Sequence, residues 1–245
     1  MEKSAKLGKL TLLNIILFGF IGQVAWAVEN NFFNTFLFSF GGTTKDISTM
    51  VAASAVVAVV TTFVMGTLSD KLGRRKVFIC AGYVAWGITV MAFAFISREN
   101  LGKLIGADPS SAAALSATVT TVIVMDCIMT FMGSTSNDSA FNAWITDITV
   151  PSNRAKTEGL LAILPVLALV IVTGVFGFIA GDDAQASDYA TCFLGLGILV
   201  IICGIIGIFT IKDTGSGQKS DGNFFADLIY GFRPSVIKSH KCLYL

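Results

Sequence analysis

Two long segments without a charged residue, residues 47–69 and 77–97, flank a short basic turn at residues 70–76. Each segment is longer than the about 18 apolar residues that indicate a membrane-spanning helix. Only helices and closed barrels pair all of their backbone N–H and C=O groups inside lipid. Neither segment shows the alternation of polar and apolar residues that is typical of barrel strands. The sequence therefore predicts two antiparallel membrane helices joined by the turn.

The rest of the chain repeats this pattern. Hydrophobic residues make up 54% of the 245 residues and charged residues 13%, whereas soluble domains carry about 25% charged residues. Six segments qualify as spans: residues 11–39, 48–69, 77–97, 115–141, 159–180 and 189–211. We predict an all-α membrane protein, with a six-transmembrane-helix bundle over residues 1–211 and a polar cytoplasmic segment at residues 212–245.

The distribution of cations predicts the orientation of the bundle. With six spans, both termini lie on the same side, and that side holds all but three of the 17 lysines and arginines. The exceptions are Lys45, Arg98 and Lys103. Cation-rich loops face the cytoplasm. We expect a multi-pass protein of the plasma (inner) membrane with both termini cytoplasmic.

Several classes of function lack support in the sequence. The single histidine, His240, lies in the polar tail, and the five cysteines have no partners at metal-ligand spacing. No cluster of nucleophiles, histidines or carboxylates has catalytic spacing. The basic tail is interrupted by acids, which favours a solvated loop over a nucleic-acid interface. We expect no enzyme activity, no catalytic residues, no metal site, no organic cofactor and no nucleic-acid partner.

The turn carries a recognisable motif. Residues 66–76 read GTLSDKLGRRK, and the pattern G-x-L-x-D-x-x-G-R-R resembles the signature loop between the second and third helices of the major facilitator superfamily of transporters. The resemblance implies one half of that fold, built from two three-helix inverted repeats. The segment after residue 211 would then join the halves, and the last residues resemble the start of a seventh helix. We expect a chain truncated after its first half, with an ordinary tail as the alternative.

The same resemblance implies a gating loop at the cytoplasmic surface. Gly66 and Gly73 would allow close approach of neighbouring backbone, and Asp70 would pair with cations or helix N-termini of the missing C-terminal half or of a second copy. Arg74 and Arg75 would anchor at the anionic leaflet. The alternative is that the cations only set the topology.

Polar residues within the first span are candidates for a binding site. Gln23, Asn30 and Asn34 lie within about 20° of one line along a helix, and Trp26 flanks this stripe. The amides would either line a water-filled cavity or hydrogen-bond to neighbouring helices. Glu29 points to a neighbouring face near the outer boundary of the membrane.

The fourth span also holds polar residues. Asp138 and Asn142 share a face at i, i+4 spacing, whereas Asp126 and Asp138 are 120° and about 18 Å apart on an α-helix and do not form a carboxylate pair. Residues 137–149 resemble the fourth helix of the glycoside-pentoside-hexuronide:cation symporters, which implies that Asp138, with Asn137 and Asn142 beside it, helps to bind cation and sugar. Residues 22–29 resemble the first helix of sucrose-type carriers.

These observations together predict a secondary transporter that carries a sugar or another small polar solute with H⁺ or Na⁺. Its partners would be the lipid bilayer, the solute and the second half of the fold. Two alternatives stay open at this point. The chain would be an inert half-transporter, or it would be a six-helix structural or channel protein.

Overall fold

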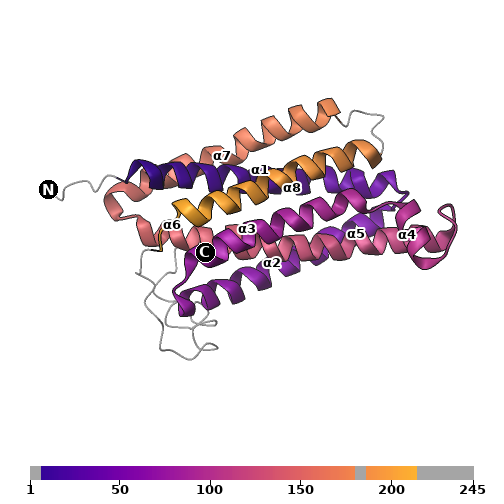
Figure 1. Cartoon of the computed structure of the whole chain (residues 1–245), viewed down its shortest axis with the longest axis horizontal. Coiled ribbons are helices and arrows are strands. Elements are labelled where there is room, and N and C mark those ends of the chain that lie inside the picture. Colours follow the sequence, from indigo (N-terminus) through magenta and orange to yellow (C-terminus); the bar gives the residue numbers. More distant parts are fainter. Residues whose placement is uncertain (1–6, 180–185, 214–245) are drawn as a thin grey trace, which may run out of the picture.

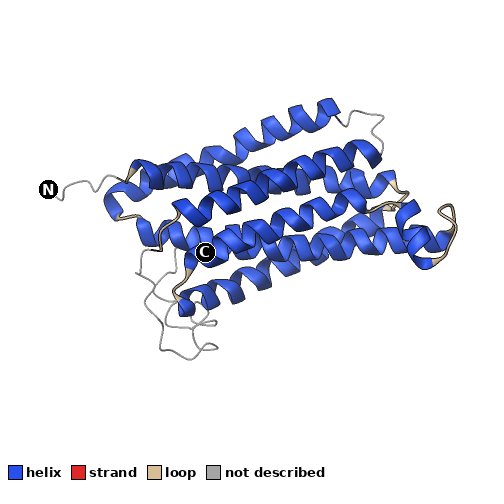
Figure 2. Ribbon diagram, viewed as in Figure 1, coloured by secondary structure: helices blue, strands red, loops and turns tan. Residues whose placement is uncertain are grey.

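The computed structural model describes residues 7–179 and 186–213, and the regular elements of this part of the chain are all helices (Figure 2). In chain order they are α1 (Lys9–Ser39), α2 (Thr44–Leu72), α3 (Arg75–Ala92), η1 (Phe93–Phe95), α4 (Arg98–Ile105), α5 (Ala112–Gly133), η2 (Ser134–Phe141), α6 (Asn142–Ile148), α7 (Pro151–Ile179) and α8 (Ala186–Thr210). The predicted all-α membrane fold is confirmed.

Six helical stretches in this part of the chain are long and apolar enough to cross a membrane. The fourth is composite, because α5, the π-helix η2 and α6 follow one another without a break from Ala112 to Ile148. The fifth begins at Pro151, eight residues before the predicted start at residue 159, since it includes a polar first turn. The predicted segment at residues 212–245 lies outside the described residues from residue 214 onward.

The spans run side by side along the long axis of the molecule (Figure 1). The starts of α1, α3 and α7 lie at the same end of the bundle as the ends of α2 and α8. The short helix α4 lies at the opposite end, and hydropathy alone did not predict it. Within α4, Lys103 Nζ donates a hydrogen bond of 2.7 Å to Glu99 Oε1, which holds the pKa of the Glu99 carboxyl below its usual value.

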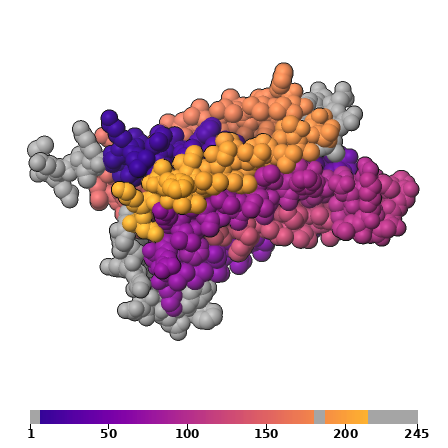
Figure 3. Space-filling model, in the orientation of Figure 1, coloured from indigo at the N-terminus to yellow at the C-terminus, as the bar shows by residue number. Residues whose placement is uncertain are grey.

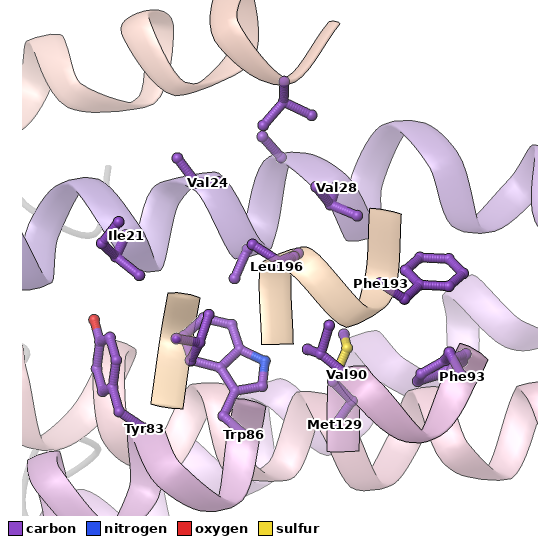
Figure 4. Packing of buried hydrophobic residues seen from close by; sticks show 14 of the residues in the cluster. Ile21, Val24, Val28, Tyr83, Trp86, Val90, Phe93, Met129, Phe193 and Leu196 are labelled. Atoms are coloured by element: carbon purple, nitrogen blue, oxygen red, sulfur yellow. The ribbon is translucent and has the colours of Figure 1, made fainter. Parts of the chain in front are cut away.

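Aromatic side chains form the centre of the core between α1, η1 and α8. The ring of Phe33 lies 4.5 Å from that of Phe93 and 5.4 Å from that of Phe193, measured between centroids. These rings are fully or almost fully buried. Figure 4 shows how Phe93 and Phe193 meet below α1, next to Val28 and Leu196. Since lipid is as apolar as these rings, their tight geometry rather than exclusion from water holds the helices together.

Glycines bring α3 and α8 into close contact. An added Cβ at Gly87 would come within 2.6 Å of the Gly197 carbonyl oxygen, and one at Gly204 would come within 2.9 Å of the Cys80 carbonyl oxygen. Small residues allow this approach in membrane helices. By contrast, Gly177 of α7 has nothing within 4 Å of an added Cβ. Close helix packing therefore depends on the α8 glycines 197 and 204, whereas Gly177 makes no such contact with the described residues.

The helices differ in how far the bundle buries them. The most apolar stretches of α1 and α3 are each 50% buried, whereas those of α2 and α7 are 17% and 22% buried. Exposed side chains on α2 and α7 are largely apolar, such as Val56, Val59, Val166 and Val170. These two helices therefore present wide apolar faces to whatever surrounds the bundle.

Candidate functional site

A polar pocket opens between α1, α2, α5 and η2. Its volume is about 450 Å³. A smaller pocket of about 150 Å³ adjoins it and shares four of its residues. The polar or indole-bearing residues that line the larger pocket are Gln23, Trp26, Glu29, Asn30, Ser54, Thr130 and Asp138. The smaller pocket adds Asn34 and Asp126. We call the two together the polar pocket.

The predicted stripe on α1 lies along the polar pocket. Gln23 and Asn30 line the larger part and Asn34 the smaller part. The Asn30 Nδ2 group donates a hydrogen bond of 2.8 Å to the Trp26 carbonyl oxygen, one turn earlier in the same helix. The stripe therefore faces an open space rather than a neighbouring helix, and of the two alternatives from the sequence the structure favours the cavity.

Glu29 lies between the two parts of the pocket and lines both of them. Its Oε1 atom accepts a hydrogen bond of 3.2 Å from Thr130 Oγ1 on α5, and its buried Oε2 atom has no hydrogen-bond partner in the described part of the chain. The sequence placed Glu29 on a face next to the stripe, and the structure shows that this side chain lines the polar pocket as well. The pocket is wide enough to include Glu29, which precedes Asn30 in the sequence, as well as the stripe of Gln23, Asn30 and Asn34.

Asp126 of α5 lines the smaller part of the pocket and is only 2% exposed. Its Oδ1 atom, like Glu29 Oε2, has no hydrogen-bond partner among the described residues. Glu29 lies within electrostatic range of both Asp126 and Asp138. Helical geometry indicated that Asp126 and Asp138 do not form a pair. It gave no sign that Glu29, on another helix, lies near both of them.

The π-helix η2 sets the direction of Asp138. Thr135 and Ser136 donate hydrogen bonds of 2.7 and 2.8 Å to the carbonyl oxygens of Phe131 and Met132, four residues earlier. Such bonds compete with the regular α-helical pattern. Short π-helical turns are often found at functional sites. Here the widened turn places Asp138 at the pocket, where its Oδ2 atom accepts a hydrogen bond of 2.9 Å from Ser134 Oγ.

Two predicted neighbours of Asp138 do not line the polar pocket. Asn137 is buried, and its Nδ2 group donates a hydrogen bond of 2.6 Å to the Tyr83 hydroxyl, which itself donates to the Phe18 carbonyl oxygen at 2.6 Å. Asn142 is exposed, and its Nδ2 group donates to the Asp138 carbonyl oxygen at 3.0 Å. Because a π-turn rotates the residues after it, the i, i+4 relation in the sequence does not give a shared face for side chains here.

The turn at residues 66–76 holds a second polar cluster. Gly73 ends α2 in the left-handed conformation with φ of 61°, where glycine has no steric penalty. Arg75, which begins α3, is 7% exposed and forms an ion pair with Asp70. Its Nε atom lies 3.1 Å from Asp147 Oδ2 on α6, and its NH1 group donates a hydrogen bond of 2.6 Å to Ser69 Oγ. We call these four residues the arginine cluster.

The structure of the turn bears on the expectations about the gating loop and corrects the one for Arg75. Arg75 points into the bundle instead of toward the leaflet, because two carboxylates and a hydroxyl surround it there. Arg74 is exposed, as a leaflet anchor requires. Asp70 already has a partner within the bundle. An added Cβ at Gly66 would meet Ser139 Oγ at 3.5 Å, an ordinary contact, so no close approach among the described residues requires glycine there.

Sequence reasoning missed the pocket residues Glu29, Ser54 and Thr130. For Glu29 a signal was present, since an acid within an apolar span is costly and therefore a candidate for function. Ser54 and Thr130 gave none, because single hydroxyl residues are common in membrane helices. Within residues 7–179 and 186–213, no group of three or more histidine, cysteine or acidic residues is close enough to hold a metal ion.

Comparison with known proteins places this bundle in a family. No curated protein and no solved structure matches the chain. The sequence pattern of the Major Facilitator Superfamily matches residues 15–240, which include the polar pocket, the arginine cluster and the six apolar helices apart from residues 9–14 of α1. The chain belongs to the major facilitator superfamily of membrane transporters.

Proposed function

We propose that this transporter is a symporter that moves a small polar solute, such as a sugar, together with H⁺ or Na⁺. The observation that carries the proposal is the pair of buried acids in the polar pocket. Glu29 and Asp126 each have a carboxylate oxygen without a hydrogen-bond partner among the described residues, and Asp138 lies within electrostatic range of Glu29. Among the described residues, no lysine or arginine lines either part of the pocket.

The acids suggest a division of roles within the pocket. Buried carboxylates without a nearby cation cost free energy, and a bound proton or sodium ion removes this cost. We assign the coupling ion to Glu29 and Asp126 in the smaller part of the pocket. Asp138, Gln23 and Asn30 line the larger part, where Trp26 offers an aromatic face and the side chains offer several hydrogen-bond donors and acceptors to a solute.

The polar pocket is open on one side, which is expected if a second six-helix bundle completes it. Transporters of this superfamily bind substrate between two similar halves that rock against each other. The largely exposed apolar faces of α2 and α7 support this arrangement. We further propose that the cation-rich end of the bundle faces the cytoplasm, which reporter fusions after Arg154 (cytoplasmic) and Lys103 (external) would test.

The experiment measures coupled uptake in vesicles that contain the purified chain. A panel of radiolabelled monosaccharides and disaccharides is offered with an inward gradient of H⁺, of Na⁺ or of neither ion. We expect at least one sugar to accumulate under one gradient only. Glu29→Gln and Asp126→Asn should abolish this accumulation, whereas Glu99→Gln, which changes an exposed acid on α4, should not.

The controls separate the alternatives. Accumulation that is normal in Glu29→Gln and Asp126→Asn would contradict the assigned coupling site. Sugar movement that ignores both gradients would contradict symport and indicate a channel or a uniporter. If no sugar accumulates, the experiment is repeated with the chain joined to a second copy of itself, and failure there as well would leave the inert half-transporter as the better account.

A further inference from the structure

An apolar groove runs along the outer face of the bundle, at a distance from the polar pocket. Its volume is about 480 Å³, and it lies on α3 with one residue from α8. On the face that Figure 3 shows, α3 and α8 run side by side. Small side chains shape the groove, among them Cys80, Ala81 and Ala85, and Ile88 and Ile208 border it.

Lys76 is the one charged residue among the described residues that line the groove, and it lies at the cation-rich end of the bundle. Lys76 occupies the first turn of α3 and makes no ion pair with any described residue. Arg74 and Lys212 are exposed at the same end. Asp213 lies beside Lys76, and its Oδ1 atom accepts a hydrogen bond of 2.9 Å from the Lys76 backbone amide. Among the described residues next to the start of α3 and the end of α8, the cations Arg74, Arg75, Lys76 and Lys212 outnumber Asp213 and the Arg75 partner Asp70.

The length of the groove matches one leaflet. From Lys76 to Ile88 the helix rises about 18 Å, at 1.5 Å per residue. Half of the hydrocarbon core of a bilayer is about 15 Å thick. A chain that entered at Lys76 would thus reach the middle of the membrane at Ile88. An apolar trough of this length with a cation at its surface end complements an acyl chain that carries an anionic headgroup.

We infer that this groove holds one anionic glycerophospholipid, with an acyl chain along Ala81 and Ala85 and the phosphate next to Lys76. Amino groups near a membrane surface attract anionic lipids. A specific lipid site also needs a place for the acyl chain, and the groove provides it. The bound lipid would cover the glycine contact between α3 and α8 on its membrane side.

The test counts lipids that stay on the purified chain in detergent, by native mass spectrometry. The chain is offered equal amounts of phosphatidylglycerol and phosphatidylcholine with identical acyl chains. We expect one retained lipid that is mainly phosphatidylglycerol. Lys76→Gln should lower the preference for phosphatidylglycerol about fivefold, the effect of one cation near an anionic surface. Ala85→Phe should fill the groove and abolish the retention of both lipids.

Matched variants test the assignment. Ala162→Phe places the same ring on an exposed face of α7 at a similar depth from the cation-rich end, and Lys103→Gln removes a cation from the other end. Neither should change retention. If Ala85→Phe does not fold, Ala81→Leu takes its place, because Ala81 is exposed. Equal retention of both lipids, or unchanged retention in the groove variants, would overturn the inference and indicate another occupant, such as a second copy of the chain.

Discussion

Arg75 in the arginine cluster bonds to two carboxylates and a hydroxyl, whereas Glu29 in the polar pocket accepts one hydrogen bond and leaves its second oxygen unpaired. Arg75 is 7% exposed and the Oε2 atom of Glu29 is itself buried, so contact with solvent does not explain the difference. The arginine cluster satisfies its charges within the described part of the chain. The polar pocket keeps unsatisfied acceptors, which is the state expected of a site that binds something from outside.

The first prediction concerns the cation of the arginine cluster, Arg75. Arg75→Gln leaves Asp70 and Asp147 without their partner, and we expect it to lower the free energy of unfolding by about 3 kcal/mol. This value is at the lower end for a broken buried pair, because Asp70 is 56% exposed. Thermal unfolding in detergent measures the effect. Arg74→Gln is the matched control, and an equal loss in both variants would contradict the comparison.

The second prediction concerns the backbone that presents Arg75. Gly73→Ala forces a Cβ into the left-handed conformation and should lower the free energy of unfolding by about 1–2 kcal/mol. Gly66→Ala, at the other glycine of the motif, should leave stability unchanged or slightly raised, since the added Cβ makes only an ordinary contact. The same unfolding measurement compares them. A larger loss in Gly66→Ala than in Gly73→Ala would show that the motif depends on packing rather than on the turn.

The third prediction has the smallest effect and the opposite sign. Glu29→Gln removes an acid whose second oxygen is unpaired, and we expect stability to be unchanged or higher by about 1 kcal/mol. The amide still accepts the hydrogen bond from Thr130. Thr130→Val serves as the companion variant and should lower stability, because it leaves Glu29 without that bond. A clear loss of stability in Glu29→Gln would mean that the acid is part of the framework.

Much of the fold could be predicted from the sequence, and the reason is the lipid environment. A span must be helical, so length and hydropathy indicated the six helices. The left-handed helix end at Gly73 was not predicted, because the sequence assigned this glycine to close approach of neighbouring backbone. The site was harder to predict. Helical geometry placed Gln23, Asn30 and Asn34 on one line, and all three line the polar pocket.

Predictions from α-helical geometry were wrong where the backbone is not an α-helix. The shared face of Asp138 and Asn142 assumed an α-helix, whereas residues 134–141 form the π-helix η2, in which Thr135 and Ser136 donate hydrogen bonds to carbonyl oxygens. The sequence also did not indicate that Arg75 points into the bundle. Arg74 and Arg75 are chemically identical neighbours, and the partners that fix Arg75 include Asp147, 72 residues later in the chain.

The unbroken run from α5 through η2 to α6 has a mechanical consequence. This one rod carries Thr130 and Asp138 at the polar pocket and Asp147 at the arginine cluster. Asp138 lies in η2 and Asp147 in α6, nine residues later along the same unbroken run. A rod of this kind transmits rotation. If occupancy of the pocket turns Asp138, the torque reaches the Arg75 contact without passing through any loop.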